Sequence, residues 1–243
     1  MRSVQRGARR GLVSVSQVRS ASSTAAAHQY CLDLVKKHDF DSYVAGLLLP
    51  ADARNSYFAI RSFNAEIAMI RDNTHGNAMA GRIRFQWWRD LLQEIYHGQN
   101  GQASMLATSP VAQALAEGVH KHSLSERWLE RSLDARQRDM AGEQPDTLDA
   151  LENYAEEGHS SLHYLVLQSL GVSGEASEYA ASHVGVASGL TTMLRGFPHH
   201  ASQVGPPLHA CVFVYPLSPF LVNALTHSSP LSHHRAKCTC RAN

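Results

Sequence analysis

Apolar residues recur at helical spacing in the middle of the chain. One set follows the i, i+3, i+7, i+10 spacing of a single helix face and consists of Phe85, Trp88, Leu92 and Ile95. Trp87 points to another side of the same helix. We therefore expect this helix to be covered on more than one face, as in the interior of a helical bundle.

A second stripe lies upstream and has the same period. It consists of Ala53, Tyr57, Ile60, Phe63 and Ile67, with Phe58 and Met69 on the opposite side. A third helix is indicated by apolar residues that lead to Gly171, a plausible C-cap. Small side chains fill residues 180–189, which favours the close approach of a neighbouring helix. These patterns predict an all-helical domain.

Turn-forming residues separate the helical stretches. Gly, Asn, Ser, Thr and Pro collect near residues 73–81, 98–109 and 142–147, where we expect loops. No stretch of useful length alternates between apolar and polar residues, and no internal repeat is present. With 243 residues, the chain is long enough for one good-sized domain with a real core.

The first 27 residues differ from the rest in composition. They hold five arginines and six serines, and the first acidic residue of the chain is Asp33. On a helical wheel, Arg2, Arg6, Arg9 and Arg10 lie opposite an apolar side. An amphipathic, Arg-rich and acid-free leader is typical of a mitochondrial transit peptide, with Arg19 in a plausible processing region. The alternative is a disordered basic tail, which phased charges argue against.

Charge limits the partners of the central region. All 21 acidic residues lie within residues 28–200, which have a net charge of −7, although the whole chain is near neutral at +1. An acidic domain is a poor electrostatic partner for nucleic acid, so we expect no nucleic-acid partner.

The composition changes again at the C-terminal end. Six prolines follow from Pro198 onward, no acidic residue follows Glu178, and three of the four cysteines lie here. We therefore expect residues 201–243 to form a divergent, disordered tail. Three alternatives are a membrane span at 208–225, a soft-metal site at Cys238 and Cys240, and a disulfide framework. Prolines within the apolar run, the C-x-C spacing and the isolation of Cys31 argue against them.

Three segments together resemble a known family. They are ADARNSYFAIRSFNAEIAMIRD at 51–72, RFQWWRDLL at 84–92 and LENYAEEGHSSLHYLVLQSLG at 151–171. They are similar to the squalene/phytoene synthase family of all-helical isoprenoid synthases, from about Tyr30 to about His200. The resemblance implies an all-α, isoprenoid-synthase-like helical bundle over residues 28–200, truncated at its C-terminal end.

The first acidic motif of that family has aspartates at i and i+4, which hold the magnesium ions that neutralise a diphosphate leaving group. Pairing Ala59 with the alanine before the motif puts Ala65 and Met69 on the two positions. Glu66 is the one acidic neighbour. A single carboxylate does not replace two pairs of magnesium-binding aspartates. We interpret Glu66 as a solvated or salt-bridged helix residue.

The second acidic motif falls on residues 189–200. Its two aspartate positions are Gly196 and His200. Pro198 predicts that the helix ends by Phe197, because proline lacks an N–H and disfavours α geometry in the residue before it. Because both aspartate pairs are missing on this alignment, we predict no catalytic residue, no cofactor-binding residue, no metal ligand and no cofactor.

Other candidate chemistry is weak. His120 and His122 are two apart on a presumed helix and diverge. His159 and His163 are four apart and share a face, but no helical carboxylate nearby completes a site. We interpret them as surface or packed histidines. Another helix carries a run of charges interpreted as a solvated, ion-paired face: Arg127, Arg131, Asp134 and Arg138.

One branch of the family is described as lacking the paired aspartates and as acting in the biogenesis of mitochondrial respiratory complex I. Resemblance to that branch implies a non-catalytic assembly factor on the matrix side of the inner membrane. Its expected partners are complex I subunits or other assembly factors, with peripheral contact to the inner membrane or to lipid. Two alternatives remain: an active isoprenoid (prenyl diphosphate) transferase with relocated metal ligands, and a non-functional truncated variant.

Overall fold

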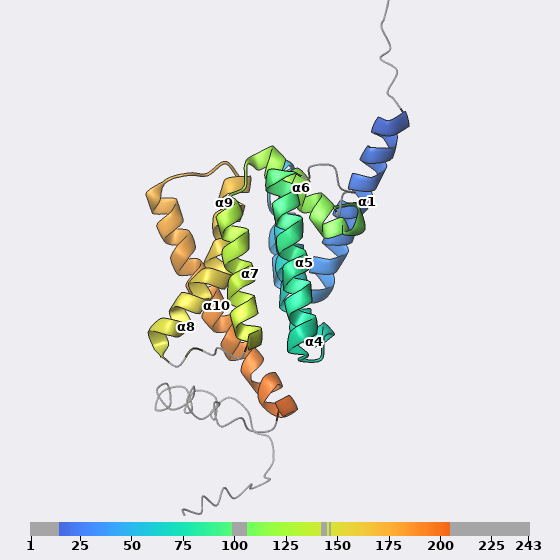
Figure 1. Ribbon diagram of the computed structural model, residues 1–243. Coiled ribbons are helices and arrows are strands. Elements are labelled where there is room, and N and C mark those ends of the chain that lie inside the picture. The colour runs from blue at the N-terminus through green and yellow to red at the C-terminus, as the bar shows by residue number, and fades with distance from the viewer. Residues whose placement is uncertain (1–14, 99–105, 142–144, 146, 205–243) are drawn as a thin grey trace, which may run out of the picture. The chain divides into compact units, whose positions relative to one another are not determined.

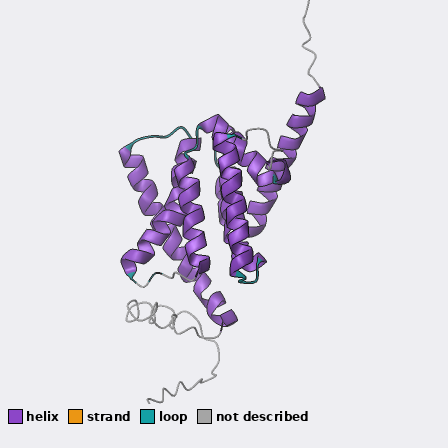
Figure 2. Ribbon diagram, viewed as in Figure 1, coloured by secondary structure: helices purple, strands orange, loops and turns teal. Residues whose placement is uncertain are grey.

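The computed structural model describes residues 15–98, 106–141, 145 and 147–204. Every regular element in these ranges is a helix, as Figure 2 shows. The helices are α1 (Val15–His38), α2 (Phe40–Leu47), α3 (Ala51–Ala68), α4 (Ile70–Asn73), α5 (Ala78–His97), η1 (Leu106–Thr108), α6 (Pro110–His122), α7 (Glu126–Ala141), α8 (Leu148–Ala155), the π-helix η2 (Glu156–Ser160), α9 (Ser161–Ser169) and α10 (Glu175–Val204). The all-α prediction is confirmed.

The chain divides into two units, Met1–Leu194 and Arg195–Asn243, and each is described by itself. In the first unit, α3 packs against α1, α6 and α9, and α7 packs against α5, η2 and α9. Figure 1 shows α5 and α7 lying side by side along much of their length. Of the second unit, the described residues are those at the end of α10.

Both apolar stripes are buried as expected. Ile60, Phe63 and Ile67 of α3 are at most 1% exposed, and Trp88 of α5 is 2% exposed. The rings of Phe63 and Trp88 meet edge to face with centroids 5.0 Å apart, which joins the two stripes directly. Burial of these large side chains stabilises the bundle by roughly 1.5–3 kcal/mol each.

Polar caps in the predicted loops start the helices. The side chain of Asn77 accepts hydrogen bonds from the N–H groups of Met79 and Ala80 at the start of α5. Ser109 and Thr147 cap α6 and α8 in the same way. Such caps satisfy backbone donors that have no partner within the helix. Parts of the predicted loops at 73–81 and 98–109 are nevertheless helical, because α5 begins at Ala78 and η1 spans Leu106–Thr108.

Two helices cross boundaries expected from the sequence. Pro198 does not end its helix: α10 continues to Val204, so the prediction of an end by Phe197 is wrong. Proline weakens a helix by removing one hydrogen bond, but the bonds on either side still hold it. Helix α1 runs through the boundary between residues 27 and 28, and Ala27 is 2% exposed. Residues 201–204, the start of the predicted tail, belong to α10 and are not disordered. The rest of that tail, from residue 205, and the leader up to residue 14 lie outside the described residues.

Candidate functional site

The last turn of α3 holds the two positions of the first acidic motif. Ala65 is buried at 7% exposure, and Met69 follows the helix as its C-cap. The N–H of Met69 bonds to the carbonyl oxygen of Ala65, and α4 begins at Ile70. On the alignment expected from the sequence, these two apolar side chains stand at the aspartate positions of the first motif.

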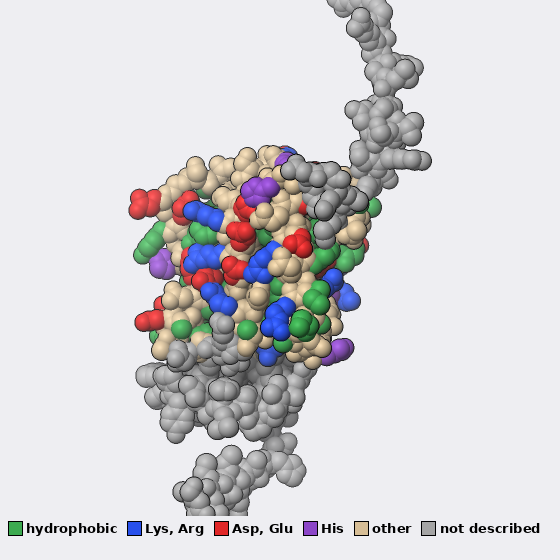
Figure 3. All heavy atoms as spheres, in the orientation of Figure 1, with side chains coloured by type: hydrophobic (Ala, Val, Ile, Leu, Met, Phe, Trp, Pro, Cys, Tyr) green, Lys and Arg blue, Asp and Glu red, His purple; other side chains and the backbone are tan. Residues whose placement is uncertain are grey.

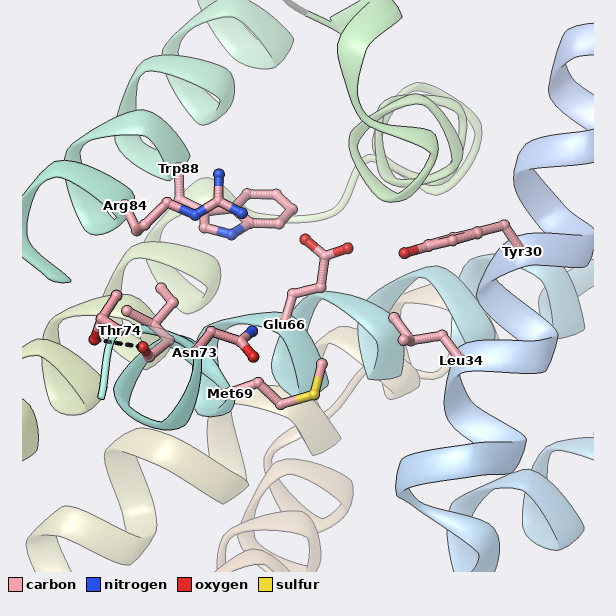
Figure 4. Close-up of a pocket in the computed structure, with 9 residues that line it drawn as sticks. Tyr30, Leu34, Glu66, Met69, Asn73, Thr74, Arg84 and Trp88 are labelled. Carbon is pink, nitrogen blue, oxygen red and sulfur yellow. Dashed lines mark hydrogen bonds between the residues drawn. The ribbon is translucent and has the colours of Figure 1, made fainter. Parts of the chain in front are cut away.

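A pocket of about 190 Å³ lies beside this turn. Figure 4 shows that its lining side chains come from four helices, α1, α3, α4 and α5, and from the adjoining turn. They are Tyr30, Leu34, Glu66, Met69, Ile70, Asn73, Thr74, Arg84 and Trp88. Met69, one of the two expected motif positions, and Glu66 therefore line the same pocket.

Glu66 is the carboxylic acid of this pocket. Its side chain points into the space between Tyr30 and Arg84 (Figure 4). Burial raises the pKa of Glu66, and the positive charge of Arg84 offsets part of that rise. The guanidinium of Arg84 lies over the ring of Trp87, 5.0 Å from its centroid. Glu66 is half-buried at the pocket, within reach of the Arg84 charge, so it keeps partial contact with solvent and has a basic neighbour.

The second motif lies on α10. Gly196 is a helical residue there, and His200 follows one turn later. Both belong to the second unit of the chain. Neither position carries a carboxylate.

The described residues contain no group of three or more His, Cys, Asp and Glu side chains that could hold a metal ion. Magnesium prefers several oxygen ligands, and the pocket supplies one carboxyl group whose proton is held more tightly than usual. The residues present at Glu66 therefore do not fit a magnesium-binding site.

A second polar cluster lies where α3 meets the start of α2. Arg61 donates hydrogen bonds to Asp39, the N-cap residue of α2. Burial opposes ionisation of Asp39, but the Arg61 charge and the Ser42 hydrogen bonds outweigh it and lower the pKa of this carboxyl group. The pair fixes the start of α2 against α3.

The charge of Arg61 acts on two histidines, His159 and His163. Burial, with the positive charges of Arg136 and Arg61, lowers the pKa of His159 to about 3. Burial and Arg61 lower the pKa of His163 as well. The interpretation of both as packed histidines is confirmed, but the sequence did not reveal that Asp39 lies near His159. Both imidazoles are held neutral at physiological pH.

The π-helix η2 brings polar groups against α10. Glu156 accepts hydrogen bonds from the hydroxyls of Tyr164 and Ser182, at 2.7 and 2.9 Å. Burial opposes its ionisation, but hydrogen bonds from Ser160, Tyr164 and Ser182 outweigh that effect and lower the pKa of Glu156. Sequence analysis missed this group, because nothing in the apolar period marks a π-turn.

Small residues allow the close approach of α10. A Cβ at Gly189 would lie 2.8 Å from the Cβ of Ala155 and 3.0 Å from Nδ1 of His159. A Cβ at Gly185 would lie 2.7 Å from the backbone nitrogen of Ser160. The expectation of close packing at residues 180–189 is confirmed.

The charged run on α7 forms ion pairs with its neighbours. Asp134 pairs with Arg89 of α5 at 2.5 Å, and Arg138 pairs with Glu157. Figure 3 shows acidic and basic side chains interspersed over the face that α5 and α7 present. Such a mixed, exposed surface agrees with the interpretation of a solvated face.

These features match a known protein family. The family model described as squalene/phytoene synthase matches residues 35–205, which is more than half of the chain. The chain belongs to the squalene/phytoene synthase family. The resemblance drawn from the motifs is thereby confirmed.

Several curated relatives carry the same name, "NADH dehydrogenase (ubiquinone) complex I, assembly factor 6". The Bos taurus protein is 37% identical over 195 residues, which cover 79% of this chain and 56% of the relative. The Homo sapiens protein is 37% identical over 204 residues, covering 82% and 59%. A Drosophila melanogaster homolog is 31% identical over 198 residues, covering 81% and 59%. The chain thus spans a little more than half the length of these relatives.

Solved structures show the same fold. A dehydrosqualene synthase in complex with ligand superposes with a TM-score of 0.60 at 21% identity, covering 76% of this chain and 62% of that chain. A squalene synthase from Alicyclobacillus acidocaldarius superposes with a TM-score of 0.62 at 18% identity, covering 75% and 67%. The isoprenoid-synthase helical fold is confirmed.

None of the helices in the described part of the chain combines the length and the hydropathy of a membrane-spanning segment.

Proposed function

We propose that this chain is a non-catalytic assembly factor for mitochondrial respiratory complex I. The observation that carries the proposal is its 37% identity, over about four fifths of its length, to proteins named as complex I assembly factor 6. Its partners would be complex I subunits or other assembly factors.

The chemistry of the pocket supports the non-catalytic part of the proposal. Ionisation of a prenyl diphosphate needs divalent cations to neutralise the leaving group, and paired carboxylates hold those cations. Here Ala65 and Met69 occupy the first pair of positions and Gly196 and His200 the second. Glu66 alone remains, and burial favours its protonated form.

The proposed location is the matrix side of the mitochondrial inner membrane, in peripheral contact with it. The relatives' name connects them with a mitochondrial complex. The Arg-rich, acid-free composition of residues 1–27 is consistent with import.

Rescue of complex I assembly tests the proposal. Cells that lack their own assembly factor would receive the full chain, and native gels would measure assembled complex I. We expect rescue by the chain and by its Glu66→Gln variant equally, because assembly needs no carboxylate at that position. Failure of the chain to restore complex I, although imported and folded, would contradict the assembly role and favour the non-functional variant.

A direct assay separates the enzymatic alternative. The purified chain, incubated with farnesyl or geranylgeranyl diphosphate and magnesium, should release no diphosphate and form no condensed product. Magnesium-dependent turnover that Glu66→Ala abolishes would establish an active transferase with relocated ligands.

A further inference from the structure

The pocket beside the end of α3 holds one acidic and one basic side chain. Among the described residues that line it, Glu66 is the carboxylic acid and Arg84 is the base. The ion pairs that join described residues include neither of them. Both groups are therefore available to a ligand that brings the opposite charge into the pocket.

The two groups lie near each other and border the same space. Figure 4 shows the carboxyl group of Glu66 between the ring of Tyr30 and the guanidinium of Arg84. The Arg84 charge reaches Glu66, because it offsets part of the rise that burial causes in the pKa of that carboxyl group. Arg84 is itself placed over the ring of Trp87, 5.0 Å from the ring centroid. One small ligand can therefore contact both groups at once.

The balance of charge in the pocket selects a ligand with two opposite charges. An amine pairs with Glu66 but is repelled by Arg84, and a carboxylate or phosphate has the reverse difficulty. A zwitterion pairs with both through charge-assisted hydrogen bonds, which are the stronger kind in proteins. Burial makes the ionised form of Glu66 costly, and the ammonium group of such a ligand relieves that cost.

The rest of the pocket sets the size and polarity of the ligand. Its volume of about 190 Å³ equals about six water molecules at ~30 Å³ each and is below the roughly 300–1,000 Å³ of pockets for drug-sized ligands. Leu34, Met69, Ile70 and Trp88 give the pocket an apolar wall. The hydroxyl of Thr74 is bonded to the carbonyl oxygen of Ile70 at 2.8 Å. This space suits a small molecule with a short apolar side chain.

The polar side of the pocket is the side that meets solvent. Tyr30 is 44% exposed, and Asn73 and Arg84 are exposed as well. On the apolar side, Ile70 and Trp88 are only 4% and 2% exposed. A ligand therefore reaches the charged groups from solvent and turns its apolar part toward the interior.

We propose that this pocket binds a free α-amino acid with an apolar side chain. The ammonium group pairs with Glu66, the carboxylate pairs with Arg84, and the side chain packs against Met69 and Trp88. Both charged groups of an α-amino acid are attached to one carbon, which suits an acid and a base that lie near each other without an ion pair. A phosphoethanolamine headgroup has the same two charges but no apolar part to cover the wall. The inference goes beyond the assembly role and does not depend on it.

Calorimetric titration of the full chain tests the class of ligand with four probes. They are L-leucine, 3-methylbutylamine, which is leucine without its carboxylate, 4-methylpentanoate, which is leucine without its ammonium group, and glycerophosphoethanolamine. We expect L-leucine to bind roughly tenfold or more tightly than each of the others. Each of the other probes leaves a charged group or the apolar wall without its partner.

Two variants assign the charges. Glu66→Gln should lower the affinity for L-leucine roughly tenfold or more and should raise the affinity for 4-methylpentanoate, because a repelling carboxylate is removed. Arg84→Gln should lower the affinity for L-leucine to a similar extent and should raise the affinity for 3-methylbutylamine. Arg82→Gln and Glu152→Gln change exposed charges outside the pocket and should leave L-leucine binding unchanged. Cooperative thermal unfolding shows that each variant remains folded.

Three results would overturn the inference. No binding of L-leucine, or binding that both pocket variants leave unchanged, would mean that this pocket is not an amino-acid site. A single-charge analogue that binds as tightly as L-leucine would show that the pocket does not recognise a zwitterion. Tighter binding of glycerophosphoethanolamine, lost in both variants, would replace the amino acid by a phospholipid headgroup. Complex I rescue is measured separately, so none of these results decides the assembly role.

Discussion

At the residue scale, Glu66 is the one carboxyl group among the residues that line its pocket. Because its folded-state pKa is raised above 4.5, the folded chain binds the proton more tightly than the unfolded chain does. Stability is therefore lost as the pH rises from 4.5 through the folded pKa. The neutral side chain of glutamine avoids that loss.

We expect Glu66→Gln to raise the free energy of unfolding at pH 7 by about 0.5–2 kcal/mol, the range common for single stabilising substitutions. Urea unfolding at pH 7 measures the change. Glu152→Gln on the exposed side of α8 is the control and should have little effect. A Glu66→Gln variant less stable than the parent would show that the carboxylate is engaged in a stabilising interaction instead.

His159 should give the opposite dependence of stability on pH. Its pKa falls from 6.5 to about 3 on folding, so its contribution to stability is present above pH 6.5 and is lost as the pH falls toward 3. The loss amounts to about 3–5 kcal/mol at the acid end, from 1.36 kcal/mol per pKa unit.

Unfolding of the parent and the His159→Gln variant across this pH range isolates the effect. The variant is less stable at pH 7, because a buried ring is replaced, but its stability should fall less steeply between pH 6.5 and 4. His120→Gln, which changes an exposed histidine, should leave the slope of the parent. Parallel curves for parent and His159→Gln would refute the buried neutral imidazole.

At the element scale, α10 depends on two glycines to reach η2. Helix propensity alone predicts that Gly185→Ala stabilises by about 1 kcal/mol. The structure predicts the reverse sign, because the new Cβ would lie 2.7 Å from the Ser160 nitrogen and closer still to its Oγ and Cα. We expect a net loss of about 1–3 kcal/mol in thermal or urea unfolding.

Gly158 provides the matched control on the other side of this contact. No heavy atom lies within 4 Å of the position its Cβ would take. Gly158→Ala should therefore be neutral or stabilising. Equal effects at Gly158 and Gly185 would mean that α10 does not approach η2 this closely.

Periodicity predicted the helices well and their junctions poorly. The stripes of Ile60 and Trp88 were visible because burial repeats every three or four residues along one helix. The approach of Asp39 and Arg61 to His159 was not, since it joins three segments with no common period. Pro198 did not end the helix as predicted. The local backbone preference of proline is weaker than the helical hydrogen bonding on both sides of it.

At the scale of the whole molecule, the packing of α1 limits where the leader can be cleaved after import. Ala27, Cys31 and Val35 lie in the core, at no more than 2% exposure. Removal of residues 1–27 would take away part of that contact. We therefore expect processing upstream of Thr24, near Arg19, as N-terminal sequencing of the imported chain would show.

Replacement of Arg2, Arg6, Arg9 and Arg10 by glutamate should stop import of the chain into isolated mitochondria, because the leader would lose its positive face. The same leader fused to a passenger protein tests sufficiency. Import of the glutamate variant at the parent's rate would exclude a transit peptide in this segment.

The burial of Cys31 makes the docking of α1 measurable in time. Its side chain is fully shielded, and burial raises its pKa to about 11, so the reactive thiolate is scarce while the helix is in place. In a chain with Cys211, Cys238 and Cys240 changed to serine, alkylation can occur only at Cys31. The alkylation rate then reports how often α1 detaches from α3 and exposes this thiol. Alkylation as fast as that of a small free thiol would mean that α1 is rarely docked; alkylation slower by orders of magnitude would give its opening equilibrium directly.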